Sequence, residues 1–217
     1  MTTCVPAGLL EDVQQRLLAL YALPPQASVA GFLIPQDAAV DYPGGGSRTL
    51  VTQQGDEVSV GLILDAAVTR GLSDQDPRVR LCGGNLDCFC ALTEEVSHFV
   101  YLLFCAEVER SITQLELELQ GEVDKYLTAA FLLSLQNEGA VSSRLRELLF
   151  REYRLAERLS DEQGERYHEA SRLAYRYCGF LESRFLRGSR VTDLAREARR
   201  FYRLGQREKL ERIADLA

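Results

Sequence analysis

The sequence lacks the motifs that identify several large enzyme classes. It has no tryptophan, two histidines and one methionine among its 217 residues. It contains no GxxxxGK[ST] or GxGxxG phosphate-binding motif and no GxSxG nucleophile motif. The sequence therefore gives no signal for a P-loop nucleotide-binding protein, a dinucleotide-dependent enzyme or an α/β-hydrolase.

Long apolar runs are also missing. The longest run, Phe99–Ala106, has eight residues, whereas a helix needs roughly 20 to cross a bilayer. Residues 1–10 have no basic region followed by an apolar run, so they do not resemble a signal peptide. We expect a soluble cytoplasmic protein that does not associate with membranes.

The six cysteines form no CxxC pair. Cys105 and Cys178 lie in apolar helical segments, which favours reduced, mostly buried thiols in a cytoplasmic protein. Cys82, Cys88 and Cys90 lie close together in the sequence, but their spacing does not match that of structural zinc sites. The leading interpretation therefore includes no cofactor.

Lysine is nearly absent, because only Lys125 and Lys209 accompany the arginines, a bias that suggests a GC-rich bacterial genome. The net charge of −7 is unevenly distributed. Residues 1–140 carry 19 acidic and 7 basic side chains, whereas residues 141–217 carry 13 acidic and 18 basic ones. This asymmetry is compatible with an acidic partner for the basic part, with attraction between the two parts, or with pairing along exposed helix faces.

The first part of the chain predicts one helix and a small sheet. Apolar residues repeat with a helical period over residues 7–21. Three β-rich runs follow, at Val29–Ile34, Arg48–Thr52 and Glu57–Leu64, and the last two flank a turn signal at residues 53–56. We expect these runs to form a small antiparallel sheet.

From Asn85 onward the sequence is helical in character. Helices are predicted to begin near Asn85, Thr113, residues 142–143, Ser160 and Thr192, and a short one follows Gly205. The predicted fold is α+β and mostly α, with a small N-terminal antiparallel β element and one helix before a C-terminal bundle of about five or six helices. The boundary falls between residues 1–84 and 85–217, which form two domains or one continuous domain.

Both histidines follow a glutamate by three residues, in Glu95-Val-Ser-His98 and Glu165-Arg-Tyr-His168. Two such pairs on separate helices resemble the ferritin-like di-iron carboxylate proteins, and the resemblance implies a metal inside a helical bundle. The second pair departs from this pattern, because His168 points away from the apolar stripe of its helix. The di-iron pattern also requires an upstream helix that supplies a glutamate ligand, whereas the region before the predicted bundle has the sequence pattern of strands.

A third carboxylate, Glu122, falls within the apolar stripe of its helix, where an unpaired charge is costly. We expect Glu95, His98 and Glu122 to form a buried cluster. The cluster is either a structural network that fixes helix register, or a metal site or general acid–base pair. The candidate metal ligands are Glu95, His98, Glu122, Glu165 and His168, and the candidate ions are iron, zinc and manganese.

The last two predicted helices are rich in arginine, with apolar residues on the opposite face. Such a surface can bind an acidic protein or nucleic acid. Acidic residues among the arginines and the negative net charge of the whole protein disfavour nucleic acid. The leading hypothesis is a non-catalytic accessory or scaffold protein that binds another protein. A metal-dependent enzyme or metal-binding protein, and a nucleic-acid binder, are the alternatives. The candidate partner-binding residues are Arg196, Arg199, Arg200, Arg203 and Arg207.

Overall fold

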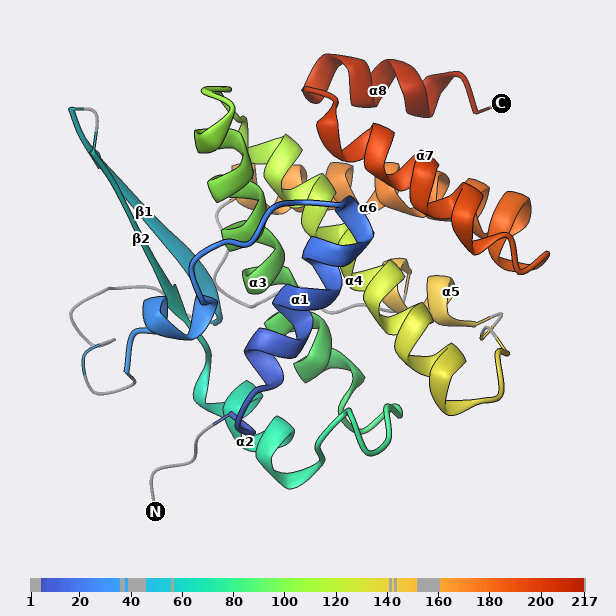
Figure 1. The fold of residues 1–217 in the computed structure, drawn as a ribbon, viewed down its shortest axis with the longest axis horizontal. Coiled ribbons are helices and arrows are strands. Elements are labelled where there is room, and N and C mark those ends of the chain that lie inside the picture. Colours follow the sequence, from blue (N-terminus) through green and yellow to red (C-terminus); the bar gives the residue numbers. More distant parts are fainter. Residues whose placement is uncertain are drawn as a thin grey trace.

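A computed structural model describes residues 5–35, 38, 46–55, 57–140, 142, 144–151 and 161–216. This part of the chain contains eight α-helices and one two-stranded antiparallel sheet (Figure 1). The mostly-α α+β class predicted from the sequence is confirmed. The elements are α1 (Leu9–Tyr21), η1 (Val29–Phe32), β1 (Arg48–Gln54), β2 (Glu57–Ile63), α2 (Ala66–Asp74), α3 (Leu86–Glu107), α4 (Gln114–Gln136), α5 (Leu145–Phe150), α6 (Asp161–Leu181), η3 (Glu182–Leu186), α7 (Val191–Arg203) and α8 (Gln206–Ala214).

Helices α3 and α4 form the centre of the molecule and run antiparallel. His98 of α3 faces Gly121 of α4, and Glu94, one turn earlier, faces Lys125, one turn later. Helix α6 packs against α4, and α1 packs against α3. Helix α3 is apolar enough by composition to span a bilayer, but its apolar window is 67% buried inside the described fold, as in a core helix.

The sheet differs from the prediction in having two strands instead of three. β1 and β2 form the expected hairpin, which projects from one side of the helices (Figure 1). Residues Val29–Phe32 form a 3-10 helix instead of a strand. A single bridge from Leu33 to Leu62, which is parallel rather than antiparallel as expected, and a hydrogen bond from the Ile34 N–H to the Leu62 carbonyl link the end of this segment to β2. This run is too short and too close to Pro35 to extend a strand ladder.

Several helix boundaries agree closely with the sequence, and two features are new. Thr113 caps α4 as predicted, because its hydroxyl accepts a hydrogen bond from the Glu116 N–H at 3.2 Å. The segment Ala66–Asp74, which lies between the predicted sheet and the predicted bundle, forms α2, whose N-terminus is capped by the Asp65 side chain. Helix α6 ends in a π-helical turn, η3, instead of continuing as an α-helix. The predictions that fall on residues 152–160 lie outside the described residues.

Two arginines of α7 hold the C-terminal end of α1. Arg199 donates hydrogen bonds to the carbonyls of Leu20 (2.7 Å) and Ala19 (3.2 Å), and Arg203 donates to the carbonyl of Tyr21 (3.0 Å). The last carbonyls of a helix have no partner within the helix, so these guanidinium groups satisfy them. The apolar side chains before and after residue 85 form one hydrophobic cluster.

A buried polar network crosses this core. The Asp124 carboxylate accepts hydrogen bonds from Tyr21, from Ser97 (2.5 Å) and from Gln120 (3.0 Å). Lys209 of α8 is fully buried and donates to the Gln120 side-chain oxygen at 2.6 Å. The network joins α1, α3, α4 and α8, so the last helix is fixed by polar as well as apolar contacts.

Replacing Lys209 by methionine should remove a pH-dependent part of the stability. Burial lowers the pKa of the Lys209 ammonium group from 10.5 to about 7. Between these values the unfolded chain binds a proton that the folded protein has released, so the Lys209 contribution to the free energy of unfolding rises with pH. The slope from this group is at most about 1.4 kcal/mol per pH unit.

Urea unfolding at several pH values between about 6 and about 9 measures this slope. The Arg207→Met variant on the exposed side of α8 is the control, and its stability should follow the unsubstituted protein across the range. A Lys209→Met variant with the same pH slope as the unsubstituted protein would contradict the prediction.

Candidate functional site: a carboxylate–histidine cluster between α3 and α4

Four polar side chains meet where α3 and α4 cross, and helical spacing places them there. Glu94 and His98 are four residues apart on α3, and Glu118 and Glu122 are four residues apart on α4, so each pair lies on one helix face. The potential ligand atoms of Glu94, His98 and Glu118 all lie within 4.8 Å of one another. The His98 Nε2 atom is 3.7 Å from the Glu118 Oε2 atom.

Gly121 permits this close approach of the two helices. A methyl group at residue 121 would lie 2.9 Å from the His98 Nε2 atom and 3.5 Å from the Glu94 Cγ atom. Cβ atoms essentially never come within 3.0 Å of a non-bonded heavy atom, so any larger residue would displace the imidazole. The absence of a side chain at Gly121 therefore sets the position of His98 against α4.

His98 has an unusual environment for a buried histidine. Its side chain is 8% exposed, and its Nε2 atom has no hydrogen-bond partner in the described structure. Its Nδ1 atom lies 4.0 Å from the Glu95 carboxylate, beyond hydrogen-bonding distance. Burial lowers the pKa of His98 to about 4, so the imidazole is neutral at neutral pH. A neutral imidazole is the form that binds metal ions.

A second layer of residues holds the carboxylates in place. The Lys125 ammonium group donates to Glu94 at 2.8 Å and to Glu122 at 2.6 Å. The Thr49 hydroxyl of β1 donates to Glu95 at 2.7 Å. The cluster is therefore built from α3, α4 and β1.

The cluster contains more negative than positive groups. Lys125 pairs with two glutamates, Glu94 and Glu122, while Glu95 and Glu118 lie 4.0 and 3.7 Å from His98, which is neutral. Burial, followed by the neighbouring Glu94 carboxylate, raises the pKa of Glu118 to about 8 and that of Glu95 well above its usual value. Burial also raises the pKa of Glu122. The largest cause of all three shifts is burial, which disfavours the ionised form of each carboxyl group.

The structure separates the predicted metal ligands into two groups. Glu95, His98 and Glu122 are buried as expected, but Glu122 pairs with Lys125 rather than with His98. Glu165 and His168 are exposed on α6, as the direction of their helix face predicted.

Glu94 and Glu118 were missed by the sequence analysis, which concentrated on the Glu-x-x-His spacing. The spacing of four residues, from Glu94 to His98 and from Glu118 to Glu122, contained the signal. Within the described residues, Glu94, His98 and Glu118 form the one group whose ligand atoms converge, and the cysteine trio Cys82, Cys88 and Cys90 does not belong to it.

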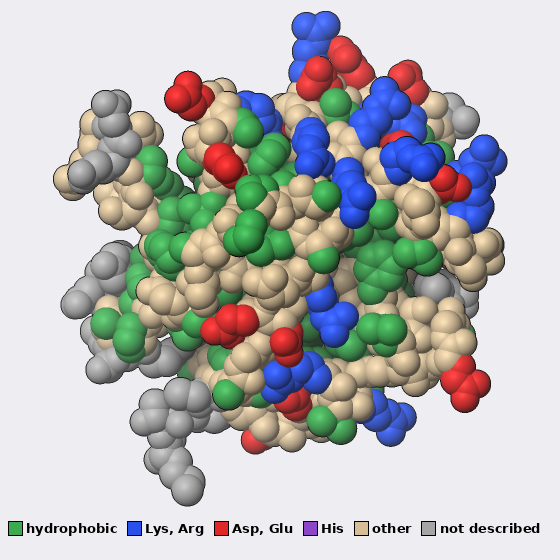
Figure 2. Space-filling model, in the orientation of Figure 1, with side chains coloured by type: hydrophobic (Ala, Val, Ile, Leu, Met, Phe, Trp, Pro, Cys, Tyr) green, Lys and Arg blue, Asp and Glu red, His purple; other side chains and the backbone are tan. Residues whose placement is uncertain are grey.

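The candidate partner-binding arginines also fall into two groups. Arg199 and Arg203 donate to backbone carbonyls of α1, as described above. Arg196, Arg200 and Arg207 are exposed. Together with other arginines they form a basic area over α7 and α8 (Figure 2).

No protein-family model matches this chain, and no curated protein or solved structure shows significant similarity to it. The function is therefore inferred from the geometry and chemistry of the residues themselves.

Alanine at Gly121 should destabilise the protein, although alanine ordinarily stabilises a helix relative to glycine. The new methyl group would overlap His98, so we expect Gly121→Ala to lower the free energy of unfolding by about 1–2 kcal/mol. Gly164 of α6 has no atom within 4 Å of its added methyl group, so Gly164→Ala should raise stability by about 0.5–1 kcal/mol. Urea unfolding of the two variants tests whether the free energy of unfolding falls in one and rises in the other. A Gly121→Ala variant that is more stable than the unsubstituted protein would contradict the close packing of His98 on α4.

Proposed function

We propose that this protein binds a divalent transition-metal ion through the carboxylates of Glu94 and Glu118 and the Nε2 atom of His98. The observation that carries the proposal is the buried Nε2 atom of His98, which has no hydrogen-bond partner in the described structure and lies 3.7 Å from the Glu118 carboxylate, in a group whose ligand atoms converge with those of Glu94. A buried polar atom without a partner costs free energy, and such atoms in a native fold call for a specific explanation. A metal ion supplies the missing partner.

The spacing of the three side chains suits this role. Two ligand atoms that each lie about 2.1 Å from a metal are separated by about 3–4.2 Å. The observed separations, with an upper limit of 4.8 Å, need only small rotations of the carboxylates to reach that range. One imidazole and two carboxylates are suitable ligands for zinc, iron or manganese.

A divalent cation also corrects the charge imbalance of the cluster. It would stabilise the ionised carboxylates that burial disfavours, and Lys125 would orient Glu94 from the second layer. A purely structural ion-pair network would instead be expected to pair His98, and in this structure its Nε2 atom is not hydrogen-bonded.

Three protein ligands leave coordination positions open, as in catalytic rather than structural metal sites. The Glu94 and Glu118 side chains are 12% and 18% exposed, so the open side of the site is reached from solvent. The class of function that this arrangement supports best is a metal-dependent enzyme that activates a bound water molecule or a substrate oxygen.

Metal content and affinity test the proposal directly. Untagged protein is analysed for zinc, iron and manganese, then stripped with a chelator and titrated with each ion, with iron kept anaerobic. We expect about one equivalent of one ion, and a rise in melting temperature on its addition. Glu118→Gln and His98→Gln should each weaken binding by about tenfold or more, because each removes a ligand.

His168→Gln provides the matched control, since this exposed histidine also follows a glutamate by three residues. Its metal affinity should equal that of the unsubstituted protein. Protein that takes up no ion at saturating metal, with an unchanged melting temperature, would refute the proposal. So would a His98→Gln variant that remains folded and binds the metal as tightly as the unsubstituted protein.

A further inference from the structure

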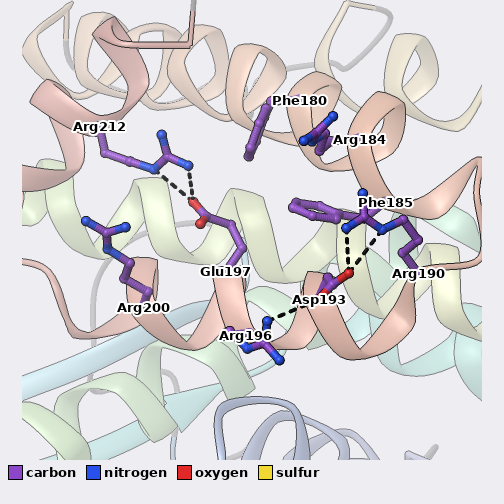
Figure 3. A pocket seen from close by; sticks show the side chains of 9 residues that line it. All are labelled: Phe180, Arg184, Phe185, Arg190, Asp193, Arg196, Glu197, Arg200 and Arg212. Carbon is purple, nitrogen blue, oxygen red and sulfur yellow. Dashed lines mark hydrogen bonds and ion pairs between the residues drawn. The ribbon is translucent and has the colours of Figure 1, made fainter.

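A groove on the far side of the bundle from β1 and β2 is lined by arginines. It lies between α7 and the end of α6 with η3, and α8 contributes Arg212 (Figure 3). Its volume is about 380 Å³. Five arginines line it: Arg184, Arg190, Arg196, Arg200 and Arg212.

Two acidic side chains of α7 neutralise part of this charge. Asp193 forms ion pairs with Arg190 at 2.7 Å and with Arg196 at 3.1 Å, and Glu197 pairs with Arg212 at 2.8 Å. The acids therefore engage three of the five guanidinium groups and fix their positions. They leave the groove with an excess of positive charge.

Arg184 and Arg200 carry that excess. Neither has a hydrogen-bond or ion-pair partner within the described part of the chain, and both are exposed. Figure 3 shows Arg200 toward the end of the groove that holds Arg212, and Arg184 toward the other end beside Phe185. Phe180 and Phe185 add apolar surface to the lining. Within the described residues, the groove thus offers two unpaired cations and a small aromatic surface, to which the half-buried Phe180 contributes more than the buried Phe185.

The π-helical turn gives one side of the groove a fixed shape. Glu182, the first residue of η3, is 4% exposed and pairs with Arg146 at 3.1 Å and Arg187 at 2.8 Å. These contacts anchor the turn that carries Arg184 and Phe185. π-helical turns are rare and occur frequently at functional sites.

We propose that this groove binds a short acidic segment of a partner protein. Carboxylates of the segment would pair with Arg184 and Arg200, and an apolar side chain would lie against Phe180 and Phe185. The planar guanidinium group matches a carboxylate in shape and charge and forms paired hydrogen bonds with it. This places partner binding at the groove rather than at Arg199 and Arg203, whose guanidinium groups hold α1.

The same observations disfavour nucleic acid as the ligand. A phosphate backbone is bound best by a continuous positive surface. Here Asp193 and Glu197 stand among the arginines, and the whole protein has a net charge of −7. A short segment that contacts only the two unpaired arginines avoids most of this repulsion.

Fluorescence anisotropy with a synthetic peptide tests the inference. The probe is a labelled peptide with a central leucine between glutamates, and its comparison peptide has glutamines in their place. We expect saturable binding of the acidic peptide that weakens with added salt. The glutamine peptide should bind at least about tenfold more weakly than the acidic peptide. The double variant Arg184→Glu with Arg200→Glu should lower affinity for the acidic peptide by about tenfold or more.

The double variant Arg172→Glu with Arg207→Glu is the charge-matched control, because both residues are exposed and outside the groove. Its affinity should exceed that of the groove variant by about fivefold or more, which separates local pairing from net charge. Circular dichroism checks that each variant is folded. Equal binding of both peptides, or equal losses in the two double variants, would overturn the inference. Tighter binding of a single-stranded oligonucleotide that depends on Arg184 and Arg200 would overturn it in favour of a phosphate ligand.

The groove shares no residue with the α3–α4 cluster. The metal titration and the peptide titration therefore test separate residues, and the failure of either proposal leaves the other standing.

Discussion

The close packing of α3 on α4 at Gly121 is the contact on which the described structure depends most. It brings His98 against the backbone of α4 and sets the distance between the carboxylates on either side. Helices α1 and α6 and the hairpin pack around this helix pair. The distance between α3 and α4 therefore also determines where these elements lie. A glycine in a helix weakens the isolated element, and here the weakness is offset by a contact that only glycine allows.

Helix α4 is buried on nearly all sides, and its polar residues fall into two groups with opposite character. The network around Asp124 is well supplied with donors, from Tyr21, Ser97 and Gln120. The cluster around Glu118 has carboxylates in excess and a histidine nitrogen without a partner. Buried polar groups are normally hydrogen-bonded. The first group follows this rule and has the properties of structural support, whereas the second leaves a buried nitrogen without a partner in the described structure.

The sequence predicted the features that local periodicity determines. The helical period gave α1, α3, α4 and α7 with small errors at their ends, and the capping residue Thr113 was identified by its spacing. The third strand was wrong, because a short apolar run does not distinguish a strand from a 3-10 turn. The buried positions of His98 and Glu122 were predictable from helix faces. Their partners depend on which residues of two helices meet, which no single-helix pattern contains.

The stacking of Tyr21 on Tyr202, with ring centroids 3.9 Å apart, joins residues that are far apart along the chain. Domains begin to fold during synthesis, starting from the N-terminal side. Helix α1 leaves the ribosome long before α7 and α8, so the Tyr21 ring and the carbonyls at the end of α1 lack these partners during most of translation. The end of α1 therefore reaches its final contacts only when the arginine-rich helices have been synthesised.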